Sequence, residues 1–450
     1  MKNCMKCIVI AIGLAVGVGA ASGQSLNEDL KLRASDGTDR DLFGNSVAID
    51  NGIVAVGAFM GRVGGLTTGA AYLFDAATGK ELFKLRAQDR ANNDRFGWGI
   101  AIEDDIVAVG AAFNDDHDSD SGSVHLFDAT TGLQRFKLTA SDAYGTQKFG
   151  YSIAIDNGIV AVGTAPSNGL NGSTGAAYLF DATTGEELFK LTPSDGAIHG
   201  RFGFSIAIDN GIVAVGSMYD DERAGSIYLF DVTTGKEIKK LIASDRMSYD
   251  HLGRSVAIDD GIVVAGASGA DLDELRVGAA YIFDASTGME LFKLTAGDGL
   301  RDDAFGSSVA IQNGRVVVGE HMGDEAGVNS GAAYLFDATT GEQLAKLTPS
   351  DGVSLERFGS TIGFDDGVIV VGENRLDGSE RHLGSAYLFD VGCRVDMNND
   401  FALNFYDVSA FFGLFLAGDL AVDFDGDGDL NFGDVSIFIA DFSKGCPFVN

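Results

Sequence analysis

Proline, tryptophan, cysteine and basic residues are all scarce in this chain. Its 450 residues include 4 prolines, 1 tryptophan and 4 cysteines, and 32 Lys+Arg are outnumbered by 65 Asp+Glu, which gives a formal net charge of -33 at pH 7. The shortage of proline excludes collagen and proline-rich low-complexity sequence. The shortage of basic residues argues against a nucleic-acid partner and against docking onto anionic membranes, because both need clustered Lys and Arg.

Glycine, in contrast, is abundant. The chain holds 62 glycines and is 45% hydrophobic, whereas glycine usually makes up about 7% of a protein. So much apolar sequence can bury a large core, and disorder is therefore not expected. Many glycines in an apolar chain indicate many tight turns and hence many short strands.

The first 23 residues have the features of a secretory signal peptide. Lys2 and Lys6 precede an apolar run over residues 8–21, and Ala21-Ser22-Gly23 offers small residues for cleavage. The run is shorter than a membrane span but has the length of a signal-peptide core. We expect residues 1–23 to be removed on export; a short N-terminal anchor is the alternative. No other apolar run reaches 18 residues, so no membrane span is expected after cleavage.

Two cysteines remain after such a cleavage. Cys393 and Cys446 bracket one small region near the C-terminus. Because exported proteins meet an oxidising environment, we expect these two residues to form a disulfide. Free thiols or a bond between chains are the alternatives.

The middle of the chain is a sevenfold repeat. A Phe-Gly pair, replaced once by Leu252-Gly253, recurs at intervals of 53 or 50 residues and starts at Phe43, Phe96, Phe149, Phe202, Phe305 and Phe358. A copy such as residues 149–195 contains an alternating strand, an Asn-Gly turn, an apolar strand, a variable loop and two further strands. Four antiparallel strands in about 50 residues are typical of a propeller blade.

The seventh copy lacks its fourth strand, and the N-terminus supplies a spare one. This copy stops at Asp390, while Leu26–Leu32 matches the fourth strand of the other copies. We therefore predict an all-β, seven-bladed β-propeller of four-stranded blades, in which the N-terminal strand completes the last blade and leaves no open edge. An open solenoid is the alternative.

Two families share motifs with these repeats. The Phe-Gly opening and the Val-Gly-Ala end of the second strand (Val56–Ala58, Val109–Ala111) resemble FG-GAP repeats. This resemblance covers residues 26–390 and implies the propeller of integrin α-chains and bacterial surface proteins, here over residues 24–391. Two-residue turns such as Asn51-Gly52 replace the usual calcium loop of that family. The Asp-Ala-Thr-Thr-Gly turns resemble those of pyrroloquinoline-quinone propellers, but those enzymes use recurring tryptophans and this chain has only Trp98.

The variable loops are expected on one face of the ring, because the short turns occupy the other. An unknown protein or glycan should be recognised on this loop face, where sequence varies over a rigid scaffold. The same face carries a recurring Asp, which indicates either a repeated turn or an acidic rim for cations or a basic partner: Asp36, Asp89, Asp142, Asp195, Asp245, Asp298 and Asp351.

Evidence for chemistry within the blades is sparse. Asp116, Asp118 and Asp120 alternate in one loop, and oxygen ligands at this spacing make it a candidate weak calcium site; a solvated acidic loop is the alternative. The 6 histidines form no metal pair at a known spacing, and no nucleophile elbow, phosphate-binding glycine loop or HExxH motif occurs. No blade concentrates Arg, Tyr, Glu and His, so the chain is expected not to be an enzyme.

Residues 392–450 contain two loops with the ligand spacing of an EF-hand. The first places Asp396, Asn398, Asp400, Asn404 and Asp407 at positions 1, 3, 5, 9 and 12, with the Ala402 carbonyl at position 7. The second places Asp423, Asp425, Asp427, Asp429, Asn431 and Asp434 at positions 1, 3, 5, 7, 9 and 12. Calcium prefers such oxygen ligands. Gly428 suits the sharp turn of the second loop, whereas Phe401 should strain the first. Apolar segments Val408–Leu416 and Val435–Phe442 follow the loops and are expected to be helical.

These paired loops, 27 residues apart, resemble a dockerin. Cys393 and the terminal Gly445-Cys446-Pro447 resemble the cysteine-ended dockerin variant of planctomycete-type bacteria. The resemblance implies calcium-dependent folding and docking to a cohesin-like partner or to the cell envelope. A calcium-stabilised cap without a partner, and acidic loops without metal, are the alternatives.

The sequence as a whole predicts a non-catalytic binding or structural protein, secreted to the exterior or cell surface of a bacterium. Its propeller would recognise a ligand, and its small α-helical dockerin-like tail would attach it. The alternative is a propeller enzyme, a hydrolase or lyase acting on extracellular polysaccharide, anchored by the same tail.

Overall fold

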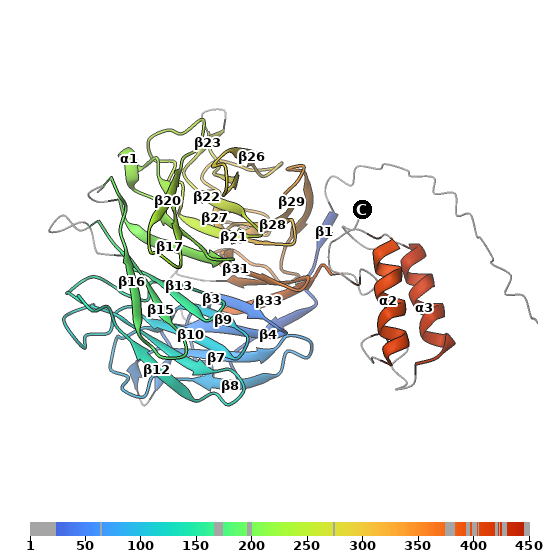
Figure 1. Cartoon of the computed structure of the whole chain (residues 1–450), viewed down its shortest axis with the longest axis horizontal. Coiled ribbons are helices and arrows are strands. Elements are labelled where there is room, and N and C mark those ends of the chain that lie inside the picture. The colour runs from blue at the N-terminus through green and yellow to red at the C-terminus, as the bar shows by residue number, and fades with distance from the viewer. Residues whose placement is uncertain are drawn as a thin grey trace, which may run out of the picture.

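The computed structural model consists of a ring of sheets and a pair of helices (Figure 1). It describes residues 24–63, 65–165, 174–195, 200–272, 275–373, 383–392, 397, 403, 405–418, 422, 424 and 430–444. The predicted signal peptide and the two cysteines of the predicted disulfide, Cys393 and Cys446, lie outside the described residues. No helix in the described part is long and apolar enough to cross a membrane.

Seven blades of four antiparallel strands form the ring, and β1 adds a parallel edge strand to one of them, which confirms the predicted propeller. The first strand of each sheet contacts the first strands of both neighbouring sheets, so the first strands surround the central axis. One isolated bridge joins each pair of neighbouring blades, and the bridge between Phe43 and Gly384 joins the first blade to the last.

The strands recur in a fixed order around the ring. The first strands are β3 (Phe43–Asp50), β9 (Phe96–Glu103), β13 (Ser152–Asp156), β17 (Phe202–Asp209), β21 (Ser255–Asp259), β27 (Phe305–Gln312) and β31 (Phe358–Asp365). The second strands are β4 (Ile53–Ala58), β10 (Ile106–Ala111), β14 (Ile159–Gly163), β18 (Ile212–Ser217), β22 (Ile262–Ala267), β28 (Arg315–Glu320) and β32 (Val368–Glu373). The third strands are β7 (Ala70–Asp75), β11 (Ser123–Asp128), β15 (Ala177–Asp181), β19 (Ser226–Asp231), β25 (Ala279–Asp284), β29 (Ala332–Asp337) and β33 (Ser385–Asp390). The fourth strands are β8 (Glu81–Leu85), β12 (Gln134–Leu138), β16 (Glu187–Leu191), β20 (Glu237–Leu241), β26 (Glu290–Leu294), β30 (Gln343–Leu347) and β2 (Leu30–Leu32).

Short elements occupy three of the loops between second and third strands. Two-stranded hairpins lie in the first and fifth blades: β5 (Arg62–Val63) with β6 (Leu66–Thr67), and β23 (Asp271–Leu272) with β24 (Leu275–Arg276). The fourth blade has a single turn, α1 (Asp220–Arg223), in which Asp221 and Glu222 have positive φ and the helix is therefore irregular.

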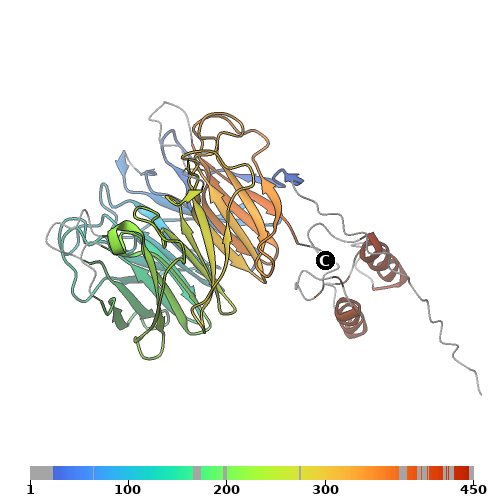
Figure 2. The ribbon, with the colours of Figure 1, turned by 90° about the horizontal axis from the view of Figure 1, so that it is seen from above.

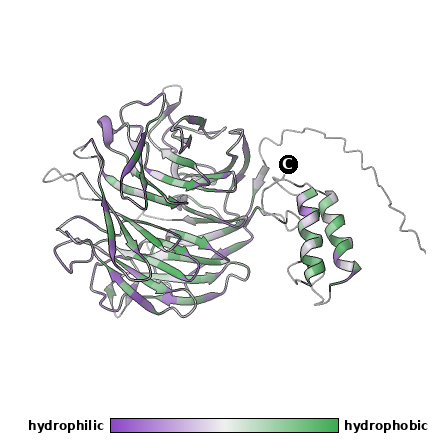
Figure 3. Cartoon of the chain, in the orientation of Figure 1, coloured by the Kyte–Doolittle hydropathy of each residue, from purple (hydrophilic) through white to green (hydrophobic). Residues whose placement is uncertain are grey.

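The hydrophobic core lies between neighbouring sheets. The ring of Phe43 packs edge-on against Tyr72 and Phe74, with ring centroids 5.6 and 5.8 Å away, and this cluster continues into Val370 and Leu388 of the last blade. Six such clusters follow around the ring. Apolar residues accordingly concentrate along the strands, and hydrophilic ones at the turns (Figure 3).

Glycine is required at the turns and at the blade contacts for different reasons. In the first hairpin Asn51 and Gly52 have φ of 47° and 73°, the left-handed pair of a type I′ turn. A Cβ on Gly52 would meet nothing within 4 Å, whereas a Cβ on Gly44 would lie 2.2 Å from the carbonyl oxygen of Ser385 in the last blade. The Phe-Gly glycine therefore allows two blades to approach closely.

The N-terminus closes the ring, although its predicted strand is divided. Leu30–Leu32 forms β2 and pairs antiparallel with β33, with Leu30 opposite Leu388. Gln24–Leu26 instead forms β1, which pairs parallel with β30 of the preceding blade. The intervening Glu28 accepts hydrogen bonds from the backbone N and the Oγ of Ser350, at 2.8 and 2.7 Å. These bonds hold the chain where it crosses from one blade to the next.

The C-terminal segment forms two helices, α2 (Phe405–Ala417) and α3 (Phe432–Lys444). They contain the two predicted helical segments and lie side by side (Figure 2). The rings of Phe411 and Phe438 stack between them at 4.0 Å with planes 11° apart. These two residues and Val422 are the buried centre of a small apolar cluster.

Candidate functional site

The recurring Asp of the loop face takes part in a contact that spans two blades. The carboxylate of Asp36, which follows β2 of the last blade, accepts hydrogen bonds from the Tyr72 hydroxyl at 2.9 Å and from Lys84 Nζ at 2.7 Å in the first blade. Burial opposes the charged form, but the hydrogen bonds from Lys84 and Tyr72 lower the pKa of Asp36 overall.

Each of the seven recurring Asp residues is paired with a lysine. The pairs are Asp36–Lys84, Asp89–Lys137, Asp142–Lys190, Asp195–Lys240, Asp245–Lys293, Asp298–Lys346 and Asp351–Lys31. These carboxylates are therefore paired with lysines, and an acidic rim for cations or a basic partner stays a prediction. The pairs join the connection of one blade to the outer strands of the next, and the Asp side chains are 42–52% exposed.

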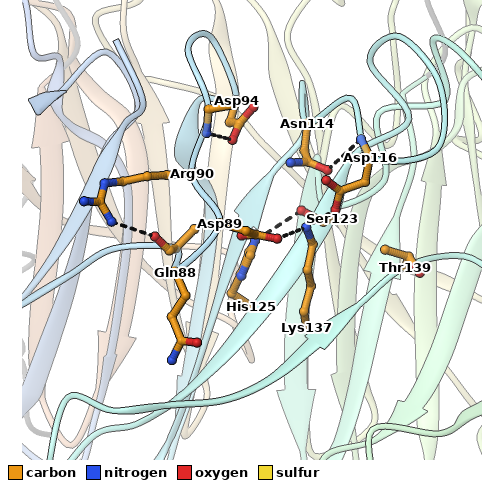
Figure 4. Close-up of polar contacts among 12 residues, drawn as sticks. Gln88, Asp89, Arg90, Asp94, Asn114, Asp116, Ser123, His125, Lys137 and Thr139 are labelled. Atoms are coloured by element: carbon orange, nitrogen blue, oxygen red, sulfur yellow. Dashed lines mark hydrogen bonds and ion pairs between the residues drawn. The ribbon is translucent and has the colours of Figure 1, made fainter. Parts of the chain in front are cut away.

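The second blade replaces the tyrosine of this contact by a histidine (Figure 4). His125 is fully buried, with Nε2 3.2 Å from Ser123 Oγ and Nδ1 3.1 Å from Gln134 Nε2. Burial lowers the pKa of His125 to about 4, so the imidazole is neutral at pH 7. Because it is closed to solvent, His125 is not placed to act on a substrate.

The candidate calcium loop of this blade is held by other contacts. Asp116 pairs with Lys137, which also pairs with Asp89, and Asp118 accepts a hydrogen bond from the backbone N of Ser119 at 2.8 Å. The backbone N of Asp120 donates to Asp115 at 2.7 Å. Among the described residues, no group of three His, Cys, Asp or Glu side chains could hold a metal ion. Calcium at this loop stays a prediction.

Three of the twelve predicted tail ligands lie in the described part of the chain: Asp407, Asn431 and Asp434. The other nine lie outside it: Asp396, Asn398, Asp400, Ala402, Asn404, Asp423, Asp425, Asp427 and Asp429. Both position-12 residues, Asp407 and Asp434, are fully buried. Asp407 accepts from the backbone N of Met397 at 3.0 Å, and Asp434 accepts from that of Phe424 at 2.8 Å. Each carboxylate thus reaches back to the second residue of its own loop, and the two contacts are equivalent.

A cavity of about 530 Å³ opens on the face that carries the variable loops. Its lining comes from the beginnings of first strands and the ends of second strands in six blades: Leu42, Asn45, Phe59, Met60, Arg95, Trp98, Tyr151, Arg254, Ser307, His321, Arg357 and Ser360. Because the first strands surround the axis, a cavity shared by six blades lies at the mouth of the central channel. We call it the channel mouth.

Two positions of each repeat supply most of this lining. The residue before the Phe-Gly pair, or its Leu-Gly equivalent, has φ between 54° and 62° in every blade: Leu42, Arg95, Lys148, Arg201, His251, Ala304 and Arg357. The residue after the pair is Asn45, Trp98, Tyr151, Phe204, Arg254, Ser307 or Ser360 in successive blades. The repeat therefore holds its backbone constant here while the side chains differ from blade to blade.

Aromatic rings form a continuous arc along one side of the channel mouth. Trp98 lies 4.6 Å from Phe59 and 5.3 Å from Tyr151, measured between ring centroids. Tyr151 in turn lies 5.1 Å from Phe204 of the fourth blade. Arg95 stacks on Phe113 with its guanidinium carbon 3.9 Å from the ring centroid, which is within cation–π range.

The remaining lining is cationic or neutral. Arg95, Arg254 and Arg357 line the channel mouth, and none of its described lining residues is Asp or Glu. His321 is only 8% exposed, and the buried Nδ1 of His321 and Nε of Arg254 have no hydrogen-bond partner among the described residues. Burial, followed by the charges of Arg254 and Arg357, lowers the pKa of His321 to about 3. The imidazole is therefore neutral beside two guanidinium groups.

Comparison with protein families shows to which family this chain belongs. The model described as FG-GAP repeat matches residues 26–74, 80–127, 133–180, 186–230, 236–283, 289–336 and 342–389. The chain belongs to the FG-GAP repeat family. Each match runs from the fourth strand of one blade into the third strand of the next, and the first begins at Leu26, beside the strand that closes the ring. A search of curated proteins finds no match.

The channel mouth of this FG-GAP propeller was missed by sequence reasoning, which looked for a cluster inside one blade. Its charged residues come one at a time from different blades: Arg95 and Arg357 precede the Phe-Gly pair, and Arg254 follows the Leu-Gly pair. Aligning the copies on Phe-Gly places Arg95, Lys148, Arg201, His251 and Arg357 in a single column. That column, of which Arg95 and Arg357 line the channel mouth, was the available signal, because equal register positions of the repeat meet around the axis of a propeller.

Proposed function

We propose that this FG-GAP propeller is an exported, non-catalytic binding protein of a bacterial exterior that takes its ligand at the channel mouth. The observation that carries the proposal is the cavity of about 530 Å³, which lies within the usual range of roughly 300–1,000 Å³ for ligand sites. It is lined by aromatic rings and a few convergent polar groups, the composition common to binding pockets. The seven blades provide the rigid frame around it.

We further propose that the tail attaches the propeller in a calcium-dependent manner to a cohesin-like partner or to the cell envelope. The oxygen donors of both loops suit calcium. In addition, Asp407 and Asp434 are buried and bonded back over their own loops, which is the position a closing ligand needs. The residues that would hold the ion are those given above for the two loops. Calcium would offset the repulsion between the carboxylates and so allow the loops to fold.

The alternative is an enzyme acting on extracellular polysaccharide. Most glycoside hydrolases use two carboxyl groups that flank the scissile bond, and the described lining of the channel mouth holds no Asp or Glu. A lyase would need a base, for which neutral His321 beside Arg254 is the candidate in this cavity. Product analysis after incubation with acidic and neutral polysaccharides separates the two functions, since a binding protein releases no fragments.

The binding proposal can be tested through Trp98, the single tryptophan of the chain, because it lines the channel mouth. A panel of glycans and extracellular proteins is titrated into the full chain while tryptophan emission is followed. At least one class of ligand should shift the emission saturably. A panel in which no ligand shifts Trp98 emission or releases heat in calorimetry would contradict the proposal. For the tail, capture of envelope proteins should succeed with calcium and fail with a chelator.

A further inference from the structure

The channel mouth carries positive charge in a chain that is strongly negative overall. Its described lining contains Arg95, Arg254 and Arg357 without a carboxylate, although the whole chain has a net charge of -33. None of these three guanidinium groups forms an ion pair within the part of the chain that the structure describes. Since partly buried guanidinium groups gain most from a bidentate anion, this site favours an anionic group.

Two hydroxyls of the channel mouth are oriented to accept hydrogen bonds. Ser307 Oγ donates to the carbonyl of Gly319 at 3.1 Å, and Ser360 Oγ donates to the carbonyl of Gly372 at 3.3 Å. Each hydroxyl has one proton, so its oxygen is left as an acceptor. A ligand that satisfies these oxygens must itself donate, which a bare carboxylate or sulfate does not. Hydroxyl groups beside the anionic group supply such donors.

The aromatic arc completes the complementarity. Trp98 and Tyr151 present neighbouring rings, 5.3 Å apart between centroids, from the second and third blades, while Arg254 and Arg357 come from the fifth and seventh. A ligand in the channel mouth therefore meets both aromatic rings and guanidinium groups, and Arg95 lies over the Trp98 ring, 5.7 Å from its centroid. A sugar ring has an apolar C–H face, several hydroxyls and, in a uronic acid, one carboxylate.

The acidic exterior limits how much of an anionic chain can approach. A long polyanion would lie across the surface of a protein of net charge -33. Its charges would be repelled by the acidic side chains within about one Debye length, which is about 8 Å at physiological salt. A cavity of about 530 Å³ holds a short segment and keeps its charge beside the arginines. The end of a chain, or a short oligosaccharide, is favoured over the interior of a long one.

We infer that the channel mouth binds the terminal uronic acid of an acidic oligosaccharide, with Arg254 and Arg357 on the carboxylate and Trp98 and Tyr151 against the sugar ring. The inference rests on the proposed binding function and gives its ligand class. Ser307 and Ser360 accept from the sugar hydroxyls, and neutral His321 adds a further polar contact without competing for the anion.

The test uses the full chain and four probes: digalacturonate, the matching neutral galactose disaccharide, inorganic phosphate and a glutamate-rich peptide. Binding is followed by Trp98 emission and by calorimetry. Digalacturonate should bind at least about 10-fold more tightly than the neutral disaccharide, the difference expected for one hydrogen-bonded charge. Arg357→Gln should weaken it by about 10-fold or more. Arg301→Gln, which removes the same charge from a side chain that is 68% exposed, should leave it unchanged.

Thermal melts show whether Arg357→Gln unfolds the ring, and Ser360→Ala is the milder variant for that case. Ser360→Ala should weaken the affinity for digalacturonate and leave the affinity for phosphate unchanged. Equal affinity for the neutral disaccharide would overturn the inference while leaving the binding function intact. Phosphate binding as tightly as digalacturonate would show a general oxyanion site, and tighter binding of the peptide would show a protein site; either would also overturn it. If neither the four probes nor the wider panel changes Trp98 emission or releases heat, the proposed binding function itself is contradicted.

Discussion

The ammonium group of Lys31 lies 2.8 Å from the carboxylate of Asp351, 320 residues further along the chain. Lys31 also donates to the Tyr387 hydroxyl, so the N-terminal strand reproduces the contact that Lys84 makes with Asp36 and Tyr72 one blade later. The last blade thus carries the same Asp–Lys–Tyr contact as the first, although its fourth strand comes from the opposite end of the sequence.

Leu32→Ala should weaken ring closure. Leu32 is 1% exposed and packs into the cluster shared by the last and first blades, and truncation of a buried leucine costs about 2–5 kcal/mol. Urea denaturation should show this loss in the free energy of unfolding. Leu133→Ala, at a side chain that is 68% exposed, should change it by less than about 0.5 kcal/mol. Equal effects of the two variants would mean that β2 does not contribute to the core.

Gly44→Ala should be far more destabilising than Gly52→Ala. Both residues have positive φ, 87° and 73°, where an L-residue costs about 1–2 kcal/mol. Only at Gly44 would the new Cβ strike a neighbour, the Ser385 carbonyl oxygen at 2.2 Å. The two blades would have to separate, so we expect at least twice the loss of Gly52→Ala in the same urea experiment. Similar losses would show that the blades can move apart at little cost.

Glu320→Gln should stabilise the propeller more at high pH than at low pH. Glu320 is 1% exposed, and burial raises its pKa from 4.5 to about 8, with Asp303 and Asp298 adding to the increase and Tyr334 and Lys346 opposing it. Tyr334 lies 2.7 Å from Glu320 and 3.0 Å from Asp298. The phenol has one proton for two carboxyl groups, which fits a protonated Glu320.

The sign of the pH effect follows from proton uptake. Between about pH 4.5 and pH 8 the folded protein holds a proton at Glu320 that the unfolded chain releases, so this residue makes the free energy of unfolding fall as pH rises. Glutamine does not titrate. The melting temperature of the variant relative to the native chain should therefore rise from pH 4.5 to pH 8 and level off above pH 8. The corresponding gain in the free energy of unfolding is up to a few kcal/mol, because one pKa unit corresponds to about 1.4 kcal/mol. Glu186→Gln, at an exposed turn residue, is the matched control.

Calcium should stabilise the tail and leave the blades unchanged. In the described part of the chain, the helices longer than one turn are α2 and α3, so ellipticity at 222 nm reports on the tail within the full protein. Calcium at about 100 times its Kd should add about 2.7 kcal/mol to the stability of that unit. Asp407→Asn or Asp434→Asn should lose most of the gain, whereas Asp39→Asn, on an exposed residue of the propeller, should keep it. Identical melts with calcium and with chelator would contradict the calcium proposal.

The propeller could be predicted from the sequence because its signals are local and repeated. The Phe-Gly pair recurs six times with one Leu-Gly replacement, and the turn after the first strand is Asn-Gly in four of the seven copies. The path of Leu26–Leu32 was predicted less well, because its division between two blades depends on the bonds from Ser350 to Glu28. Those bonds join residues 322 positions apart, which no local pattern encodes.

The candidate site was harder to predict than the fold. Arg254 and His321 are unremarkable within their own blades, and only the closed ring brings them to one cavity. The recurring Asp residues are conspicuous in the sequence, but in the structure their carboxylates pair with lysines such as Lys84 and Lys346. The sequence shows where charged residues recur, whereas the tertiary structure determines which residue each of them pairs with.

The residue with left-handed backbone angles that precedes each Phe-Gly pair can vary without affecting the packing between blades. The same backbone angle serves leucine, arginine, lysine, histidine and alanine in turn, at Leu42, Arg95, Lys148, His251 and Ala304, while the neighbouring phenylalanine or leucine keeps the blades packed. Exchanging Leu42, Arg95 or Arg357, which line the channel mouth, should change its affinity with little change in stability. The channel mouth can therefore be redesigned one contact at a time, and a change of selectivity can start at Leu42, an uncharged residue of this set that lies in its lining.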